Sequence, residues 1–230
     1  MKKRLNFPLL VFDWDGTLMD SEAHIVGCIR ASIADLGLPT LDNTAIRNII
    51  GLGLREAINR LFPGSDDSLH EQLAARYRQH FLADDRTPSE LFPGVKETLI
   101  ALHGQGYFLA VATGKGRHGL NSVLHETGCK ELFHASRCAD ECASKPHPQM
   151  LLEIMDELNV PPSNTLMIGD TEYDMHMARN AGVAAVAVSC GVHEEQRLLQ
   201  CEPLLCLTSI AELPMWLHEQ SAAQQTLGQF

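Results

Sequence analysis

The sequence lacks a long apolar run, an excess of basic residues and a Cys-x-x-Cys pair. No segment approaches the roughly 18–20 consecutive apolar residues that a membrane-spanning helix needs. The 18 Lys and Arg residues are outnumbered by 29 Asp and Glu residues, and the formal net charge of −11 repels nucleic-acid phosphates and anionic lipid. We therefore expect no nucleic-acid partner and no membrane partner. A small anionic substrate requires a metal or local cations at its site.

The seven cysteines indicate a reducing compartment. Their number is odd and they are scattered through apolar stretches such as Val188–Cys190, which is typical of reduced thiols. The basic start at Met1–Arg4 and the apolar stretch after it imitate a signal peptide, but that stretch contains Pro8 and no small-residue cleavage site follows. We expect a cytoplasmic protein.

Short apolar runs alternate with helical patterns along most of the chain, which has 230 residues, 45% of them hydrophobic. This alternation predicts an α/β fold with a doubly wound parallel sheet, whose ligands bind beyond the carboxyl ends of the strands. The expected strands are 8–12, 107–112, 132–135, 165–168 and 184–188, and the expected helices of this part are 95–103, 120–126, 148–158 and 175–181.

One segment breaks the alternation. Residues 22–86 contain no strand-like run, and their apolar residues recur at helical spacing. We therefore predict a helical domain, residues 19–89, inserted into an α/β core formed by residues 1–18 and 90–230. The last ten residues, 221–230, are expected to be frayed or partly helical.

Two acids follow the first apolar run. Asp13 and Asp15 are two residues apart, so both carboxylates are expected on one face of the extended chain. Carboxylates this close repel each other unless one is protonated or a cation joins them, and Mg²⁺ suits such hard oxygen ligands. A loop with capping aspartates is the alternative interpretation of this pair alone.

A second acidic group follows a later strand. Asp170 and Asp174 lie one helical turn apart, although Thr171 and Asp174 also have the spacing of a helix capping box. Two strands that both end in acids, in a fold that binds ligands at those ends, favour a metal site over coincidence.

Two further segments supply groups suited to phosphate. Thr113 and Gly114 end another strand, where a hydroxyl and free N–H groups can form a small phosphate cradle. Pro146 and Pro148 restrict the backbone after Lys145, whose ammonium is suited to neutralise a carboxylate and a phosphate oxygen. Taken singly, a Thr-Gly pair is usually only a turn and a lone lysine is usually solvated.

These pieces, in this order, resemble the haloacid dehalogenase-like hydrolase superfamily, and most closely its phosphoglycolate-phosphatase-like branch. The resemblance covers nearly the whole chain, and it is carried by the motifs 11–21, Thr113, 145–148 and 169–174. It implies that residues 19–89 are a helical cap, that Mg²⁺ is the cofactor, and that Asp13 is a nucleophile forming an aspartyl-phosphate.

The resemblance also implies the other roles. Asp15 would act as general acid and base, with its backbone carbonyl at the metal. Thr113, with Gly114, would bind the phosphoryl oxygens, and Lys145 would orient Asp13 and offset charge. Asp170 would bind the metal directly, and Asp174 directly or through water. Four carboxylates offset by Mg²⁺ and Lys145 would leave a charge of about −1, so phosphate should bind poorly without the metal.

Three further basic residues lie near these motifs or in the expected cap. Lys115 and Arg117 follow the Thr-Gly pair, and we expect both to be solvated rather than to contact phosphate. Arg55 follows a Gly-rich loop in the expected cap, where the resemblance places specificity loops. It is our candidate for contacting the leaving group, although an exposed arginine at a helix start is the common alternative.

The function expected is an Mg²⁺-dependent phosphatase that acts on a small phosphorylated metabolite, as a monomer or homodimer. A phosphosugar mutase of the β-phosphoglucomutase type uses the same residues and stays open. A phosphoacceptor signalling module is the non-enzymatic alternative, and Asp15 together with the inserted helices argues against it.

Overall fold

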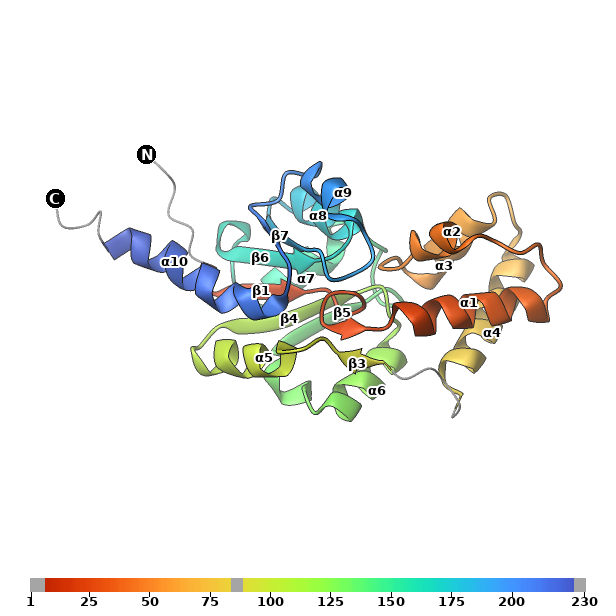
Figure 1. Ribbon diagram of the computed structural model, residues 1–230, viewed down its shortest axis with the longest axis horizontal. Coiled ribbons are helices and arrows are strands. Elements are labelled where there is room, and N and C mark those ends of the chain that lie inside the picture. The colour runs from red at the N-terminus through yellow and green to blue at the C-terminus, as the bar shows by residue number, and fades with distance from the viewer. Residues whose placement is uncertain (1–6, 84–88, 226–230) are drawn as a thin grey trace.

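The structure, a computed structural model, describes residues 7–83 and 89–225. Within these residues, six parallel strands form one central sheet in the order β5-β4-β1-β6-β7-β8 (Figure 1). Their bounds are β1 Leu9–Phe12, β4 Phe108–Thr113, β5 Ala135–Cys138, β6 Thr165–Gly169, β7 Ala184–Val188 and β8 Cys206–Leu207. The chain runs outward from β1 through β4 to β5, and then continues on the other side of β1 with β6. The ligand position of a doubly wound sheet is therefore expected at the carboxyl end of β1.

Helices cover both faces of this sheet. The helices are α5 Val95–Gly104, α6 Arg117–Thr127, α7 Gln149–Leu158, α8 Glu172–Asn180, α9 Glu195–Leu199 and α10 Leu213–Gln225. Leu10 and Phe12 of β1 pack in one apolar cluster with α5, α6 and α10, while Leu9 and Val11 pack in another with α7 and α8. Burial on both faces explains why β1 is apolar at every position. The predicted fold class is confirmed.

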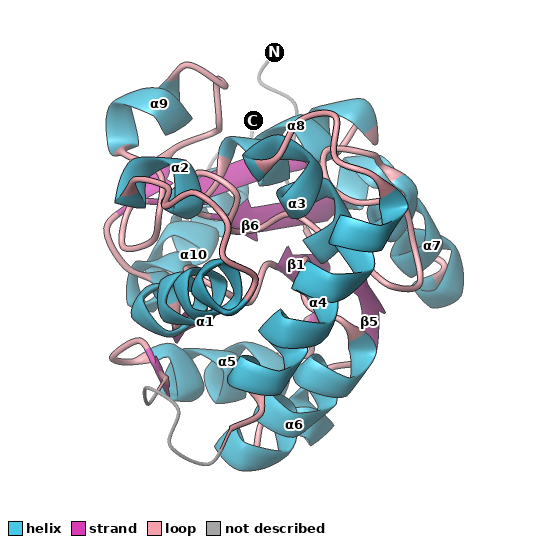
Figure 2. Cartoon of the chain, turned by 90° about the vertical axis from the view of Figure 1, so that its right-hand side faces the viewer, coloured by secondary structure: helices cyan, strands magenta, loops and turns pink. Residues whose placement is uncertain are grey.

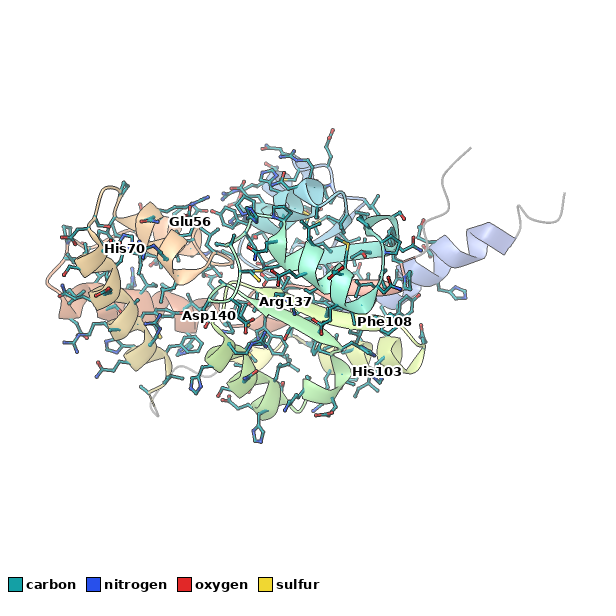
Figure 3. The ribbon with its side chains drawn as sticks, turned by 180° about the vertical axis from the view of Figure 1, so that it is seen from behind. Glu56, His70, His103, Phe108, Arg137 and Asp140 are labelled. Carbon is teal, nitrogen blue, oxygen red and sulfur yellow. The ribbon has the colours of Figure 1, made fainter. Side chains whose placement is uncertain are left out.

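Four helices form a separate group beside the sheet: α1 Glu22–Asp35, α2 Asn43–Arg47, α3 Leu54–Leu61 and α4 Asp67–Phe81. They enclose an apolar cluster of their own, which includes Ile29, Ile46 and Leu73. Seen from their side, they lie in front of the ends of β1 and β6 (Figure 2). From behind, Glu56 and His70 in this group lie at the opposite end of the molecule from His103 and Phe108 (Figure 3).

Two short strands that the sequence did not indicate join this helical group to the rest of the chain. β2 (Met19–Asp20) and β3 (Glu90–Leu91) pair antiparallel, with Met19 opposite Leu91. The segments that lead into and out of the helical group are therefore held side by side.

The bounds of some elements differ from those expected. The strand expected at 132–135 is β5, three residues later, because Leu132 belongs to a single 3-10 turn, Lys130–Leu132. β5 is an edge strand whose central residues Ser136 and Arg137 are partly exposed, so it lacks an apolar signature. Two further 3-10 turns are Pro162–Asn164 and Ile210–Glu212. Residues 221–225 of the tail lie in α10, and 226–230 lie outside the described residues.

All seven cysteines are free thiols in the structure, three of them buried. No helix among the described residues has the length and apolar character needed to cross a membrane.

Candidate active site

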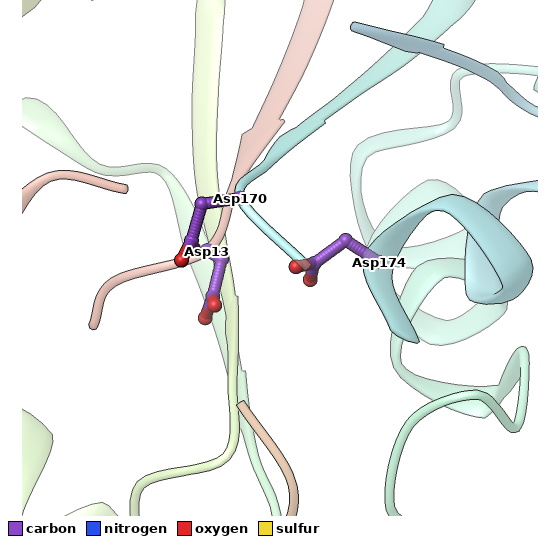
Figure 4. A group of neighbouring side chains, drawn as sticks. All are labelled: Asp13, Asp170 and Asp174. Atoms are coloured by element: carbon purple, nitrogen blue, oxygen red, sulfur yellow. The ribbon is translucent and has the colours of Figure 1, made fainter. Parts of the chain in front are cut away.

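Three buried carboxylates converge at the carboxyl end of the central strand. Asp13 directly follows β1, Asp170 directly follows β6, and Asp174 lies in the first turn of α8 (Figure 4). One oxygen of each lies within 4.8 Å of the others, and none of the three residues is exposed to solvent. The two strands carry their acids to one point because β1 and β6 pair in parallel and end together.

Each carboxylate is held by specific donors. Asp170 accepts from the Thr17 hydroxyl at 2.7 Å and from the Val192 amide at 2.8 Å. Asp174 accepts at Oδ2 from the amide and the hydroxyl of Thr171, so the capping box suggested by the sequence is present. Its Oδ1 remains directed at Lys145, and Asp174 thus serves the helix cap and the cluster at once.

Lys145 is the buried cation of the cluster. Its Nζ lies 2.8 Å from Oδ1 of Asp13 and 2.6 Å from Oδ1 of Asp174, and its side chain is completely buried. Burial lowers the pKa of Lys145, but the charges of Asp13 and Asp174 outweigh burial and raise the pKa above its ordinary value. Lys145 therefore stays charged and joins two of the three carboxylates.

The remaining negative charge is unfavourable in this setting. Burial, followed by the charge of Asp174, raises the pKa of Asp170 to about 7. Burial also raises the pKa of Asp13 well above its usual range, although Lys145 opposes the shift. A divalent cation among the three carboxylates would favour their charged forms.

The residues present fit such a cation. Asp13 Oδ1 accepts from the Trp14 amide and from Lys145, whereas its Oδ2 is buried without a hydrogen-bond partner. A buried carboxylate oxygen without a partner is costly unless a ligand satisfies it. Oxygen donors alone suit a hard ion such as Mg²⁺. The backbone packs closely against these carboxylates. A Cβ at Gly191 would lie 2.1 Å from Asp170 Oδ2, so a side chain at position 191 would collide with Asp170.

The carboxylate of Asp15 is not part of this three-carboxylate cluster. β1 ends at Phe12, and the chain then turns through Gly16 at φ +83°, so the alternation of a strand no longer applies. Asp15 Oδ1 instead lies 2.9 Å from Lys115 Nζ and accepts from the Ser21 hydroxyl.

The contacts of Lys115 and Ser21 with the Asp15 carboxylate were not predicted from the sequence. Lys115 is buried rather than solvated, and its Nζ lies 4.5 Å from the centre of the Phe81 ring on α4. The sequence did contain a signal for Lys115. It follows Thr113 by two residues, and Thr113 ends a strand at the same edge of the sheet as the acids. With Asp15 included, four carboxylates face two ammonium groups, and the two remaining negative charges match one divalent cation.

Thr113 ends β4, the strand next to β1, at the same edge of the sheet as Asp13, and Gly114 follows it. Thr113 is fully buried, and its hydroxyl accepts from the Lys115 amide at 3.1 Å. A Cβ at Gly114 would lie 2.5 Å from the Leu52 carbonyl oxygen, so only glycine allows the helical group to approach this closely.

The loop between α2 and α3 contacts the rest of the chain, which contains the six-stranded sheet and is called the sheet-bearing part, at further points. The Gly53 amide donates to the Ser144 hydroxyl at 2.8 Å, next to Lys145 in sequence. A Cβ at Gly51 would lie 3.2 Å from the Thr171 side chain. The helical group is thus packed directly over the loops that carry the acids and the lysine.

Both arginines considered from sequence, Arg55 and Arg117, lie away from the three-carboxylate cluster. Arg55 projects from α3 with 72% of its side chain exposed, and it pairs with Asp67 at 2.6 Å. The structure does not bring it to the carboxylates. Arg117 pairs with Glu141 at 2.7 Å and donates to Ser136, with about a third of its side chain exposed. Arg117 is therefore neither freely solvated nor paired with Asp13, Asp170 or Asp174.

A cavity of about 210 Å³ lies between the helical group and the sheet, with Asp15 and Gly114 in its wall. Asp140, which marks the edge of the sheet-bearing part in Figure 3, also lines it. Asp15 therefore borders a space large enough for a small organic group.

Comparison with known proteins agrees with this geometry. Residues 10–188 match the family model described as haloacid dehalogenase-like hydrolase. A protein of Dickeya dadantii named "Probable phosphatase IndB" is 38% identical over 90% of this chain and 91% of its own length. A phosphoglycolate phosphatase of Agrobacterium fabrum is 31% identical over 96% of both chains.

Comparison with solved structures also indicates a haloacid dehalogenase-like fold. A crystal structure of a protein from Bacteroides fragilis described as "Putative haloacid dehalogenase-like hydrolase" superposes with a TM-score of 0.84 and 27% identity, over 90% of this chain and 100% of that one. The matched residues include Asp13, Thr113, Lys145 and Asp170, which the fold brings to one edge of the sheet. The chain belongs to the haloacid dehalogenase-like hydrolase family.

Proposed function

We propose that the protein is an Mg²⁺-dependent phosphatase of the phosphoglycolate-phosphatase-like type, which hydrolyses a small phosphorylated metabolite in the cytoplasm through an aspartyl-phosphate. The observation that carries the proposal is the buried cluster of Asp13, Asp170 and Asp174 around Lys145, with Asp13 Oδ2 left without a partner. The names of the relatives support the choice of phosphate esters as substrates.

Asp13 is the nucleophile in this proposal. Its Oδ1 accepts from the Trp14 amide and Lys145, and its Oδ2 has no hydrogen-bond partner. In this proposal one oxygen of the carboxylate forms the bond to phosphorus and the other contacts the metal. As that bond forms, the bond between phosphorus and the alcohol oxygen breaks, and the leaving oxygen takes a proton from Asp15. Thr113 and Gly114 supply a hydroxyl and an amide near the transferring oxygens.

Asp15 then acts in the opposite direction. It takes a proton from a water molecule that attacks the phosphorus of the aspartyl-phosphate, which releases inorganic phosphate and restores Asp13. Lys115 and Ser21 hold the Asp15 carboxylate on the cavity side, where an alcohol would leave. When bound, Mg²⁺ would neutralise charge on the carboxylates and the phosphate; Asp13, Asp170, Asp174 and the Asp15 carbonyl would hold it.

We further propose that residues 19–89 act as a cap on a core made of residues 1–18 and 90–230. The helical group has its own apolar cluster and touches the catalytic loops through residues 51–53, as a closing lid would. In that position it excludes bulk water from the reacting groups.

Removal of the metal is the first test. We expect EDTA to lower the hydrolysis of p-nitrophenyl phosphate at least about 100-fold, because buried carboxylates without a cation repel a phosphate dianion. Addition of Mg²⁺ in excess over EDTA should restore the rate, as measured by nitrophenol release. Full activity in EDTA would contradict the metal-dependent mechanism.

The mutase remains the second candidate, because Asp13 and Asp15 serve it equally well. Analysis of the products of a sugar phosphate separates the two. Release of inorganic phosphate without an isomerised sugar phosphate supports the phosphatase, and an isomerised product supports the mutase.

A further inference from the structure

The cavity beside Asp15 has largely apolar walls. Apolar side chains make up much of the wall, and those of α1, α4 and the loop that precedes α3 include Ile25, Ile29, Ile50, Leu52 and Phe81. Its volume is about 210 Å³. An apolar cavity of about 150 Å³ is sufficient for benzene. The space thus fits one aromatic ring, or a short alkyl chain, with a few further atoms.

The charges around the cavity disfavour a second anion. Lys115 is the buried cation in its wall, and it is engaged by Asp15 at 2.9 Å and by the Phe81 ring. The other basic residues in the wall, Arg78 and His118, are exposed. A carboxylate or second phosphate in the interior would lose water and face Asp15, and the buried cation there, Lys115, is already paired with that carboxylate, which makes such binding costly.

One neutral polar group lines the same space. The hydroxyl of Tyr77 has no hydrogen-bond partner among the residues that the structure describes. Burial, followed by the charges of Asp15 and Cys28, raises the pKa of Tyr77 well above its ordinary value, so the hydroxyl keeps its proton. It can donate one hydrogen bond to an uncharged oxygen or nitrogen of a bound molecule.

We propose that the cavity binds the alcohol part of the substrate and selects phosphate monoesters of apolar or aromatic alcohols that carry no second anionic group. The proposal rests on the phosphatase function, because it places the leaving oxygen at Asp15. It makes 2-phosphoglycolate, whose leaving alcohol carries a carboxylate, a poor substrate, although relatives are named for that activity.

A substrate series tests this selection. We expect kcat/KM for benzyl phosphate to exceed that for 2-phosphoglycolate by about 100-fold, given the cost of a carboxylate in an apolar pocket. Among n-alkyl phosphates from ethyl to pentyl, each methylene should raise kcat/KM about fourfold, the factor that corresponds to burial of one CH₂. These esters are all unactivated, so the comparison reports mainly on the pocket.

Variants locate the selection in the cavity. Phe81→Arg, which adds a cation to the wall, should lower the ratio of the two kcat/KM values, benzyl phosphate to 2-phosphoglycolate, at least tenfold. A ratio is used because any disturbance of Asp15 affects both substrates. Arg76→Ala, on the exposed side of the same helix, should leave the ratio unchanged. If Phe81→Arg does not fold, Phe81→Ala should lower kcat/KM for benzyl phosphate more than for 2-phosphoglycolate.

The outcomes separate this proposal from the one on which it rests. Equal or better hydrolysis of 2-phosphoglycolate, or a flat alkyl series, would overturn the selection while leaving the phosphatase intact. Failure to release phosphate from any ester would instead overturn the phosphatase itself.

Discussion

Asp13→Asn is expected to abolish phosphatase activity, with kcat reduced at least about 10⁴-fold, as removal of a nucleophile does in enzymes that form a covalent intermediate. The amide cannot accept the phosphoryl group, and it also removes a negative charge from the cluster. Hydrolysis of p-nitrophenyl phosphate at saturating Mg²⁺ measures the effect.

Asp156→Asn is the matched control for this variant. Asp156 lies on the exposed side of α7, and the same chemical change there should leave kcat unaltered. The fold of Asp13→Asn should persist, because loss of one buried negative charge relieves repulsion with Asp170 and Asp174. A folded Asp13→Asn protein with substantial activity would contradict the assignment of the nucleophile.

Lys145→Met is expected to have the largest effect on stability. The variant leaves three buried carboxylates without their cation, and removal of one partner of a buried charge pair typically costs about 3–5 kcal/mol. Urea unfolding without metal should show this loss in the free energy of unfolding. Activity should also fall by about 10²–10³, because Asp13 Oδ1 loses the group that fixes it.

Two comparisons give this prediction its specificity. The double variant Lys145→Met with Asp174→Asn should recover part of the lost free energy, since one of the uncompensated charges is gone. Lys130→Met, at an exposed position, should change the free energy by no more than about 0.5 kcal/mol. Equal stability of Lys145→Met and the native chain would show that the buried ion pairs do not hold the cluster.

The main features of the site could be predicted from the sequence because they depend on strand ends. β1 is wholly apolar, β6 is mostly so, and each is directly followed by an aspartate; parallel strands next to each other carry those residues to one place. Asp174 could be added because one helical turn returns it to the side of Asp170. The helical repeat, the parallel pairing of the two strands and the positions at which they end are therefore enough to predict that these three residues lie together.

Side-chain directions beyond the strand ends could not be predicted. Asp15 follows the end of β1, where the turn at Gly16 sets its direction, and the Lys115 partner comes from another strand end. Arg55 lies on a helix whose buried face holds Ala57 and Ile58, so its exposure depends on how α3 packs rather than on the nearby glycines. Both outcomes are set by tertiary contacts that local patterns do not encode.

The edge of the sheet shows a related limit. β5 has an exposed side, so its middle residues are polar, and the apolar run that precedes it gives the stronger strand signal. The pairing of β2 with β3 was missed because each has only two residues. Short or half-exposed strands carry too few apolar positions for their period to be recognised.

The most direct measurement is to trap the phosphorylated enzyme with Asp15→Asn. Nitrophenolate leaves without a proton donor, whereas hydrolysis of the aspartyl-phosphate needs Asp15 as base. Mixing this variant with p-nitrophenyl phosphate and Mg²⁺ should therefore give a burst of one nitrophenol per chain and then near-arrest. Mass spectrometry after acid quench should find the phosphoryl group on the peptide that contains Asp13. Phosphate release without a phosphorylated chain, or a phosphoryl group at another residue, would contradict the account.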